Sequence, residues 1–328
     1  MMEPWFSAAS PYPPADTFLS LPTTTPPTPT NLLSPRKMPN REAFLTSKIL
    51  FSQLTSYPHM LVDGRGNLPP FIFPQCVLDG KSADACRSQA KGNHTCLPEA
   101  LANCTSLLHM FFNRTAASSG FVWRSIYDYQ RQLGSKTLTS DTCELVAALQ
   151  VVVILILVQA LDMQSIPTND VLSLVATTRD IAQQLHVLEA YQGSSGVDEE
   201  DAAGLSRREW TARESVRRCF CALYMVELVF EVIIAGGNAD LADRDCQGFT
   251  QLPLPAERGL WETVDDATWI RRYRDSVRCR ADPTIGHLRQ SSGVGVGDLE
   301  GAAELEYWCG TADDFGSLVW MSSLTEHS

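Results

Sequence analysis

The sequence predicts an all-α protein, and two stretches carry most of that prediction. One is the apolar run Cys143 to Met163, centred on Val151–Val158. Its β-branched residues favour a strand, but its length and the alanines and glutamines around its centre favour a helix. The other is Glu209–Gly237, which is Arg-rich at first and then apolar on nearly every face. That pattern is typical of a helix that enters the core from the surface, and Gly236 and Gly237 are expected to end it.

Composition and charge limit the class of protein. The 328 residues are 44% hydrophobic and 20% charged, enough for one large folded domain. The net charge of −12 disfavours nucleic-acid binding, because that affinity comes mainly from Lys and Arg neutralising phosphates. The start of the chain shows no signal-peptide pattern, so reduced thiols are expected. The run Val151–Val158 has no closely flanking Lys or Arg and is short for a membrane span, so it predicts a buried core helix.

The chain is expected to consist of an arm and one helical domain. Residues 1–40 are rich in Pro, Thr and Ser, including the sequence TTTPPTPT at Thr23–Thr30, and predict a disordered arm because little apolar surface can be buried. The all-α domain is expected to span residues 41–328. Its further helices are predicted at Arg41–Tyr57, from Pro98 to Phe112, at Phe121–Leu133, after Pro167 with an apolar stripe from Val171 to Leu188, at Glu262–Arg280 and near Glu304–Cys309.

Two short predictions concern the connections between these helices. The helix that Pro98 opens and the helix Phe121–Leu133, which Gly134 is expected to end, are predicted to form an antiparallel hairpin. The segment Leu68–Pro74 has prolines around an apolar triplet, which indicates an extended segment pinned to the domain. The region Gly286–Gly301 is glycine-rich, and its segment Gly293–Gly297 is expected to be a mobile loop and not a phosphate-binding one.

Catalytic and metal-binding motifs are not recognisable in the sequence. It contains no G-x-S-x-G and no H-E-x-x-H. Bringing thiolates onto one metal typically takes C-x2-C pairs, whereas Cys76, Cys86, Cys96 and Cys104 are spaced by nines and sevens. A metal site there would also need His94 or His109. We therefore expect inert thiols, and neither cofactor nor metal in this chain.

Charged side chains on the Arg-rich helix are interpreted as structural. Glu214 and Arg218 are one helical turn apart in the order that favours an ion pair, and they lie with Arg217 just ahead of the buried half. Further along, Glu227 and Glu231 are also one turn apart if the helix continues. They are expected to mark its one solvated stripe, with a coupled carboxylate pair as the alternative.

Several motifs together give the chain a resemblance to a known family. Trp210, the run Arg-Glu-Ser-x-Arg-Arg at 213–218 and the apolar helix behind it resemble the regulatory domain of fungal-specific zinc-cluster transcription factors. In that family a Leu-Pro segment, a Leu-Trp pair and a second Trp follow in the same order. Here these are Leu252-Pro253, Leu260-Trp261 and Trp269. The Leu-Pro-Pro-Phe-Ile segment at 68–72 and the Gly-x-Leu-x-Trp run at 316–320 extend the resemblance.

The resemblance implies a nuclear, non-enzymatic transcription regulator that controls a gene cluster or a metabolic pathway. Other transcription factors or coregulators are the expected partners, with a homodimer as a further option and no membrane association. The six-cysteine zinc cluster that reads DNA in this family is missing, so zinc is expected only if such a cluster lies upstream. A truncated gene model, a partner-supplied DNA reader and a DNA-free modulator would each explain that. The alternatives are an α-helical enzyme or interaction protein with an unrecognised site, and a membrane or secreted glycoprotein.

Overall fold

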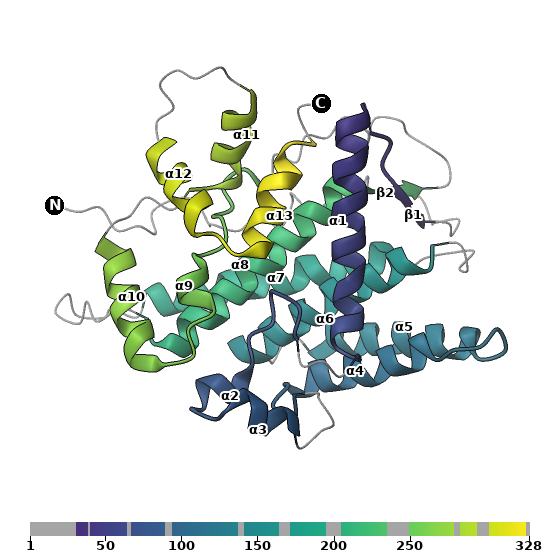
Figure 1. Cartoon of the computed structure of the whole chain (residues 1–328). Coiled ribbons are helices and arrows are strands. Elements are labelled where there is room, and N and C mark those ends of the chain that lie inside the picture. The colour runs from purple at the N-terminus through teal and green to yellow at the C-terminus, as the bar shows by residue number, and fades with distance from the viewer. Residues whose placement is uncertain are drawn as a thin grey trace.

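The all-α prediction is confirmed by the structure, a computed structural model. It describes residues 31–38, 40–63, 67–88, 94–136, 141–163, 171–194, 205–234, 249–278, 283–293 and 302–325. Within these ranges the chain forms thirteen helices and two short strands (Figure 1). Residues 1–30, which make up most of the predicted arm, lie outside the described residues.

The centre of the fold is helix α6, Thr142–Leu161. Asp141 begins it as an N-cap, because its carboxylate accepts a hydrogen bond of 2.8 Å from the backbone N–H of Glu144. Every residue from Leu145 to Ala160 is buried. Gln150, which interrupts the apolar run, donates to the Phe71 carbonyl at 2.8 Å, so its burial leaves the amide nitrogen paired.

Four helices pack around α6, which explains why α6 is apolar on all sides. They are α1 (Arg41–Met60), α4 (Glu99–Phe112), α7 (Val171–Ser194) and α8 (Arg207–Val229) (Figure 1). By length and composition, α6 is the one helix of the described residues that could cross a membrane, but 89% of its most apolar window is buried inside the protein. Because α6 is buried on all sides, it has the apolar composition of a core helix.

Helices α4 and α5 form the expected hairpin, although α5 is longer than predicted. It runs over Ser119–Lys136 and therefore passes Gly134 instead of ending there. A Cβ atom at Gly134 would lie 3.6 Å from the Thr177 hydroxyl oxygen on α7, so the glycine is found where two helices approach closely.

The sequence prediction was wrong about the end of the Arg-rich helix. Helix α8 stops at Val229, and strand β2 (Phe230–Ile234) follows it directly. Strand β2 pairs antiparallel with β1 (Asn31–Pro35), with Pro35 opposite Phe230. Residues 31–35 therefore belong to the folded domain and not to a disordered arm. Glu231 lies on a strand, so it is not one helical turn from Glu227, and Gly236 and Gly237 lie outside the described residues.

The described residues from 258 to 323 form short helices, two of which pack against α8. They are α9 (Arg258–Trp261), α10 (Asp266–Arg278), α11 (Ile285–Gly293), α12 (Ala302–Thr311) and α13 (Asp314–Ser323). Helix α11 begins one residue before the glycine-rich region and covers its first half. Helix α10 packs against α8, and α13 packs against both α1 and α8 (Figure 1). The segment Gly293–Gly297 lies almost wholly outside the described residues.

The buried apolar side chains divide into two cores. The main core surrounds α6 and α8. The second, which we call the tryptophan core, lies where the N-terminal part of α8 meets α9, α10 and two unpredicted short helices, α2 (Gln75–Leu78) and α3 (Ala83–Ser88). Its buried members are Phe73, Cys76, Val77, Cys86, Trp210, Leu260, Trp261 and Trp269.

Candidate functional site

Two charged side chains of α8 form a pair in the protein interior. Arg218 is fully buried and Glu214 is 2% exposed. Arg218 Nε lies 2.8 Å from Glu214 Oε1, as expected for residues four apart on one helix face. The distance confirms the prediction that these two residues pair. Both lie in the protein interior and not, as expected, where the helix leaves the surface.

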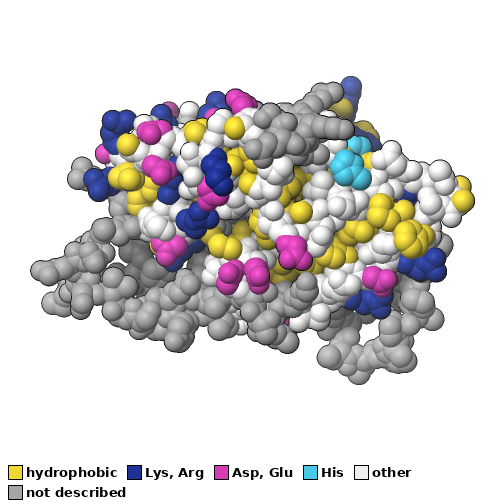
Figure 2. Space-filling view, turned by 90° about the horizontal axis from the view of Figure 1, so that it is seen from below, with side chains coloured by type: hydrophobic (Ala, Val, Ile, Leu, Met, Phe, Trp, Pro, Cys, Tyr) yellow, Lys and Arg dark blue, Asp and Glu magenta, His cyan; other side chains and the backbone are white. Residues whose placement is uncertain are grey.

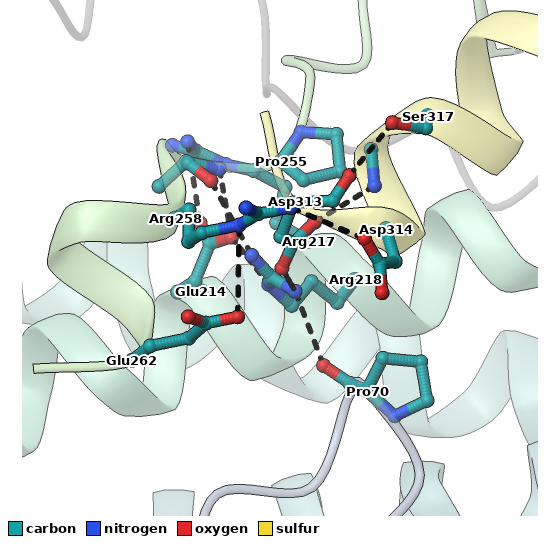
Figure 3. A network of polar contacts seen from close by, with 12 residues as sticks. Pro70, Glu214, Arg217, Arg218, Pro255, Arg258, Glu262, Asp313, Asp314 and Ser317 are labelled. Carbon is teal, nitrogen blue, oxygen red and sulfur yellow. Dashed lines mark hydrogen bonds and ion pairs between the residues drawn. The ribbon is translucent and has the colours of Figure 1, made fainter. Parts of the chain in front are cut away.

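Arg218 uses its remaining donors to hold three distant segments against α8 (Figure 3). Its Nη1 atom lies 2.6 Å from Asp313 Oδ2 and 3.3 Å from the Pro70 carbonyl oxygen. Its Nη2 atom donates to the Ala256 carbonyl at 3.3 Å. Asp313 is also the N-cap of α13, because its other carboxylate oxygen accepts from the Gly316 N–H at 2.8 Å. One guanidinium thus connects the 67–74 segment, the 252–257 segment and α13.

Glu214 makes the complementary contacts. Its Oε1 atom also accepts a 2.8 Å hydrogen bond from the Ala256 N–H, and its Oε2 atom lies 3.3 Å from Arg217 Nη1. Arg217 in turn donates to the Leu254 carbonyl at 3.4 Å. Together with Asp313, the network contains two guanidinium groups and two carboxylates, so its formal charges balance. We call these four residues the buried ion network.

An aromatic ring lies against the buried ion network, and further tryptophans lie nearby in the chain's two cores. The Arg218 guanidinium carbon lies 4.3 Å from the centre of the Trp261 ring, a cation–π distance. Trp210 and Trp269 meet edge to face with centroids 5.6 Å apart. Trp308 donates from Nε1 to the Pro255 carbonyl at 2.7 Å. Burial of Arg218 and Glu214 lowers the local dielectric constant and strengthens the attraction between their charges.

The residues that carry the family resemblance come together in space. Trp210, Glu214, Arg217, Arg218, Trp261 and Trp269 lie in the buried ion network or the tryptophan core. Leu252 is fully buried in the main core, and Pro253 forms a β-bridge with Thr284. The sequence did not predict Asp313 as a partner. Its place before a helix marks an N-cap, but nothing local points to Arg218.

The chemistry of the buried ion network is that of a structural element. Each of its carboxylates is bound to at least one guanidinium, and Asp313 also accepts a backbone N–H, which leaves no group placed for proton transfer to a substrate. Burial, with a smaller contribution from Asp313, raises the pKa of the neighbouring Tyr57 far above its usual value. Burial likewise raises the pKa of the Cys221 thiol.

A second cluster of chemically active side chains lies in and beside the tryptophan core. The ligand atoms of Cys76, Cys86, His94 and Cys96 all lie within 4.8 Å of one another. Cys76 Sγ is 3.6 Å from His94 Nδ1, and Cys96 Sγ is 3.7 Å from the same atom. The expectation that these cysteines do not converge is therefore wrong. Their convergence removes the argument from spacing on which the prediction of a metal-free chain was based.

The three thiols differ in acidity because their surroundings differ. Hydrogen bonds lower the pKa of Cys86 to about 6, with the larger contribution from Thr95 and a smaller one from His94. Burial raises the pKa of Cys76 to about 12. Cys104, the fourth cysteine of the series, lies apart in the main core, where burial raises its pKa to about 12.

Comparison of the chain with protein-family models, with curated proteins and with solved structures gave no match. The resemblance to the fungal regulatory domain therefore depends on the motifs of the chain itself and on where the fold places them.

Proposed function

We propose that this chain is the regulatory domain of a nuclear transcription regulator of the fungal zinc-cluster type, and that it is not an enzyme. The observation that carries the proposal is the convergence of the motif residues. Trp210, Glu214, Arg218, Trp261 and Trp269 span some sixty positions: the three tryptophans share one core, and Trp261 lies against the Arg218 guanidinium that pairs with Glu214. Motifs that matched by chance along the sequence would have no reason to share one site.

The arrangement supports a role in holding a regulatory domain together. The buried ion network fixes the relative positions of α8, α13 and two proline-containing segments. A domain fixed in this way presents a defined surface to other proteins. Other transcription factors or coregulators are the proposed partners, and DNA would be reached through a domain that these residues do not include or that a partner supplies.

The charge distribution also supports indirect contact with DNA. The chain carries a net charge of −12, and the face in Figure 2 mixes acidic with basic side chains and shows no continuous basic surface. The cluster of arginines on α10 is flanked by acidic residues of the same helix, Asp266 and Asp275. Phosphate neutralisation, the main source of DNA affinity, is therefore weak here.

A tethering experiment tests the proposal. The chain is fused to a heterologous DNA-binding domain and expressed in a filamentous fungus or yeast with a reporter gene behind the matching operator. We expect the fusion to change reporter transcription several-fold relative to the DNA-binding domain alone, and the unfused chain to locate to the nucleus.

Two variants make the readout specific. Arg218→Ala is expected to abolish the effect by disrupting the fold, whereas Arg131→Ala, which removes an exposed pair with Asp128, is expected to preserve it. A fusion that accumulates normally in the nucleus and leaves the reporter unchanged in either direction would contradict the proposal.

A further inference from the structure

We propose that Cys76, Cys86, His94 and Cys96 bind one zinc ion in a closed, four-coordinate structural site. The proposal concerns this chain's own C-x9-C-x7-H-x-C set. It is separate from the six-cysteine DNA reader and does not depend on the proposed function.

Two separations in the cluster already match the edges of a zinc tetrahedron, and the others are within reach of one. Bond lengths of about 2.3 Å for Zn–S and about 2.0–2.1 Å for Zn–N give tetrahedral edges of roughly 3.6 Å for S···N and roughly 3.8 Å for S···S. The two sulfur-to-Nδ1 distances are 3.6 and 3.7 Å. The widest separation of 4.8 Å would close by only about 1 Å, which side-chain torsions supply.

The donor set favours zinc over the other common metals. Thiolates are soft ligands and imidazole suits borderline ions, so three sulfurs and one nitrogen in tetrahedral reach are typical of Zn²⁺. Four protein ligands leave no open position for water or substrate, which makes the site structural. All three thiols are free cysteines, and three sulfurs grouped about one imidazole nitrogen are not the arrangement of a disulfide, which joins two.

Two of the four ligands are positioned by local features of the chain. Cys76 lies in α2, and Gly80 ends the turn after it with a φ of 67°, which lets the Lys81 N–H bond to the Cys76 carbonyl at 2.8 Å. Cys86 lies in α3, where its sulfur is 3.2 Å from the Thr95 hydroxyl. Such hydrogen bonds to a ligand sulfur orient it and stabilise its thiolate.

The zinc ion would tie together a part of the chain that has little core of its own. Helices α2 and α3 have four and six residues, too short to be stable alone. Cys76 and Cys86 belong to the tryptophan core together with Trp261, and Trp261 lies over Arg218. Zinc binding would therefore stabilise the aromatic side of the buried ion network as well.

Elemental analysis of the full chain, purified under reducing conditions without chelators, tests the proposal directly. We expect about one zinc per chain. Cys96→Ser and His94→Ala are expected to lower the zinc content at least about tenfold, because each removes one of four ligands. Cys143→Ser and Cys104→Ser, at an exposed and a buried cysteine outside the cluster, are the matched controls and should retain it.

A second measurement remains informative if the ligand variants fail to fold. Wild-type chain depleted of zinc and reloaded with Co²⁺ should show the intense visible bands of tetrahedral cobalt and the near-ultraviolet charge-transfer band of cobalt–thiolate bonds. The folded wild-type chain should also melt at least about 5 °C lower after zinc removal. Folded protein that holds less than about a tenth of an equivalent of zinc after exposure to excess Zn²⁺, that gives octahedral cobalt spectra, or that contains a disulfide among these cysteines would overturn the site.

Discussion

Arg218 and Asp313 are 95 positions apart in the chain, yet their side chains meet at 2.6 Å in the protein interior. The contact joins the middle of α8 to the first turn of α13. The same Asp313 carboxylate also caps α13, where a negative charge is favoured by the helix dipole. The Arg218 guanidinium therefore helps to set the position of α13 relative to α8.

Removing that charge should be strongly destabilising. Arg218→Met keeps much of the side-chain volume but leaves the buried Asp313 carboxylate without its cation, and leaves Glu214 with Arg217 as its remaining guanidinium partner. Breaking a buried ion pair in this way costs about 3–5 kcal/mol, a large part of a domain's stability of about 5–15 kcal/mol. Chemical denaturation should show a lowered midpoint. Arg131→Ala, at an exposed pair, should leave the midpoint nearly unchanged, and equal effects of the two substitutions would contradict the network.

Glu214 and Arg218 should behave as a coupled pair. Glu214→Ala removes one of the two carboxylates that Arg218 contacts, and Arg218→Ala leaves Glu214 with Arg217 alone, so each single variant leaves a buried charge less fully paired. The double variant removes both members of the pair, so neither is left behind as an unpaired partner of the other. In a double-mutant cycle we expect its loss in unfolding free energy to be smaller than the sum of the single losses by about 0.5–3 kcal/mol. Strictly additive losses would show that the two side chains do not interact.

The central helix should not tolerate charge. Ile154→Asp on α6 would place a carboxylate at a fully buried position, at a cost of several kcal/mol even after its pKa has shifted. We expect an insoluble or molten protein, seen as lost near-ultraviolet circular dichroism and no cooperative melting. The matched control is Val264→Asp, since Val264 is 66% exposed, and it should melt like the wild type. A normal melting curve for Ile154→Asp would refute the position of α6.

Local sequence patterns were enough to predict the features that depend on neighbours along the chain. The apolar run of α6 and its Asp141 cap were predicted because a helix buried on all sides needs apolar residues on every face. The pairing of Glu214 with Arg218 was predicted because helical spacing alone brings them together. The sequence marked Trp210, Trp261 and Trp269 only as motifs of the resemblance, and no local pattern predicted that they share one core.

Features that depend on distant partners were missed. Phe230–Ile234 follows an apolar helix without interruption, and it becomes a strand because residues 31–35 pair with it. Asp313 gave only the signal of a helix cap. The Cys76, Cys86, His94 and Cys96 set was dismissed on spacing, because spacing rules describe ligands within one short turn and these four are brought together by α2, α3 and the packing of the tryptophan core.

The last prediction concerns DNA. The chain has a net charge of −12, and the face shown in Figure 2 mixes acidic with basic side chains. DNA affinity comes mainly from the counterions released when Lys and Arg neutralise phosphates, so we expect this contribution to be small here. We expect no sequence-specific binding of duplex DNA tighter than about 1 μM at roughly 150 mM salt in a mobility-shift assay. The assay should be run with zinc-loaded and zinc-depleted chain, because a closed structural site leaves this result unchanged. Sub-micromolar binding that depends on the DNA sequence, in either form, would show that the chain reads DNA itself and would end the proposal that it reaches DNA through another domain.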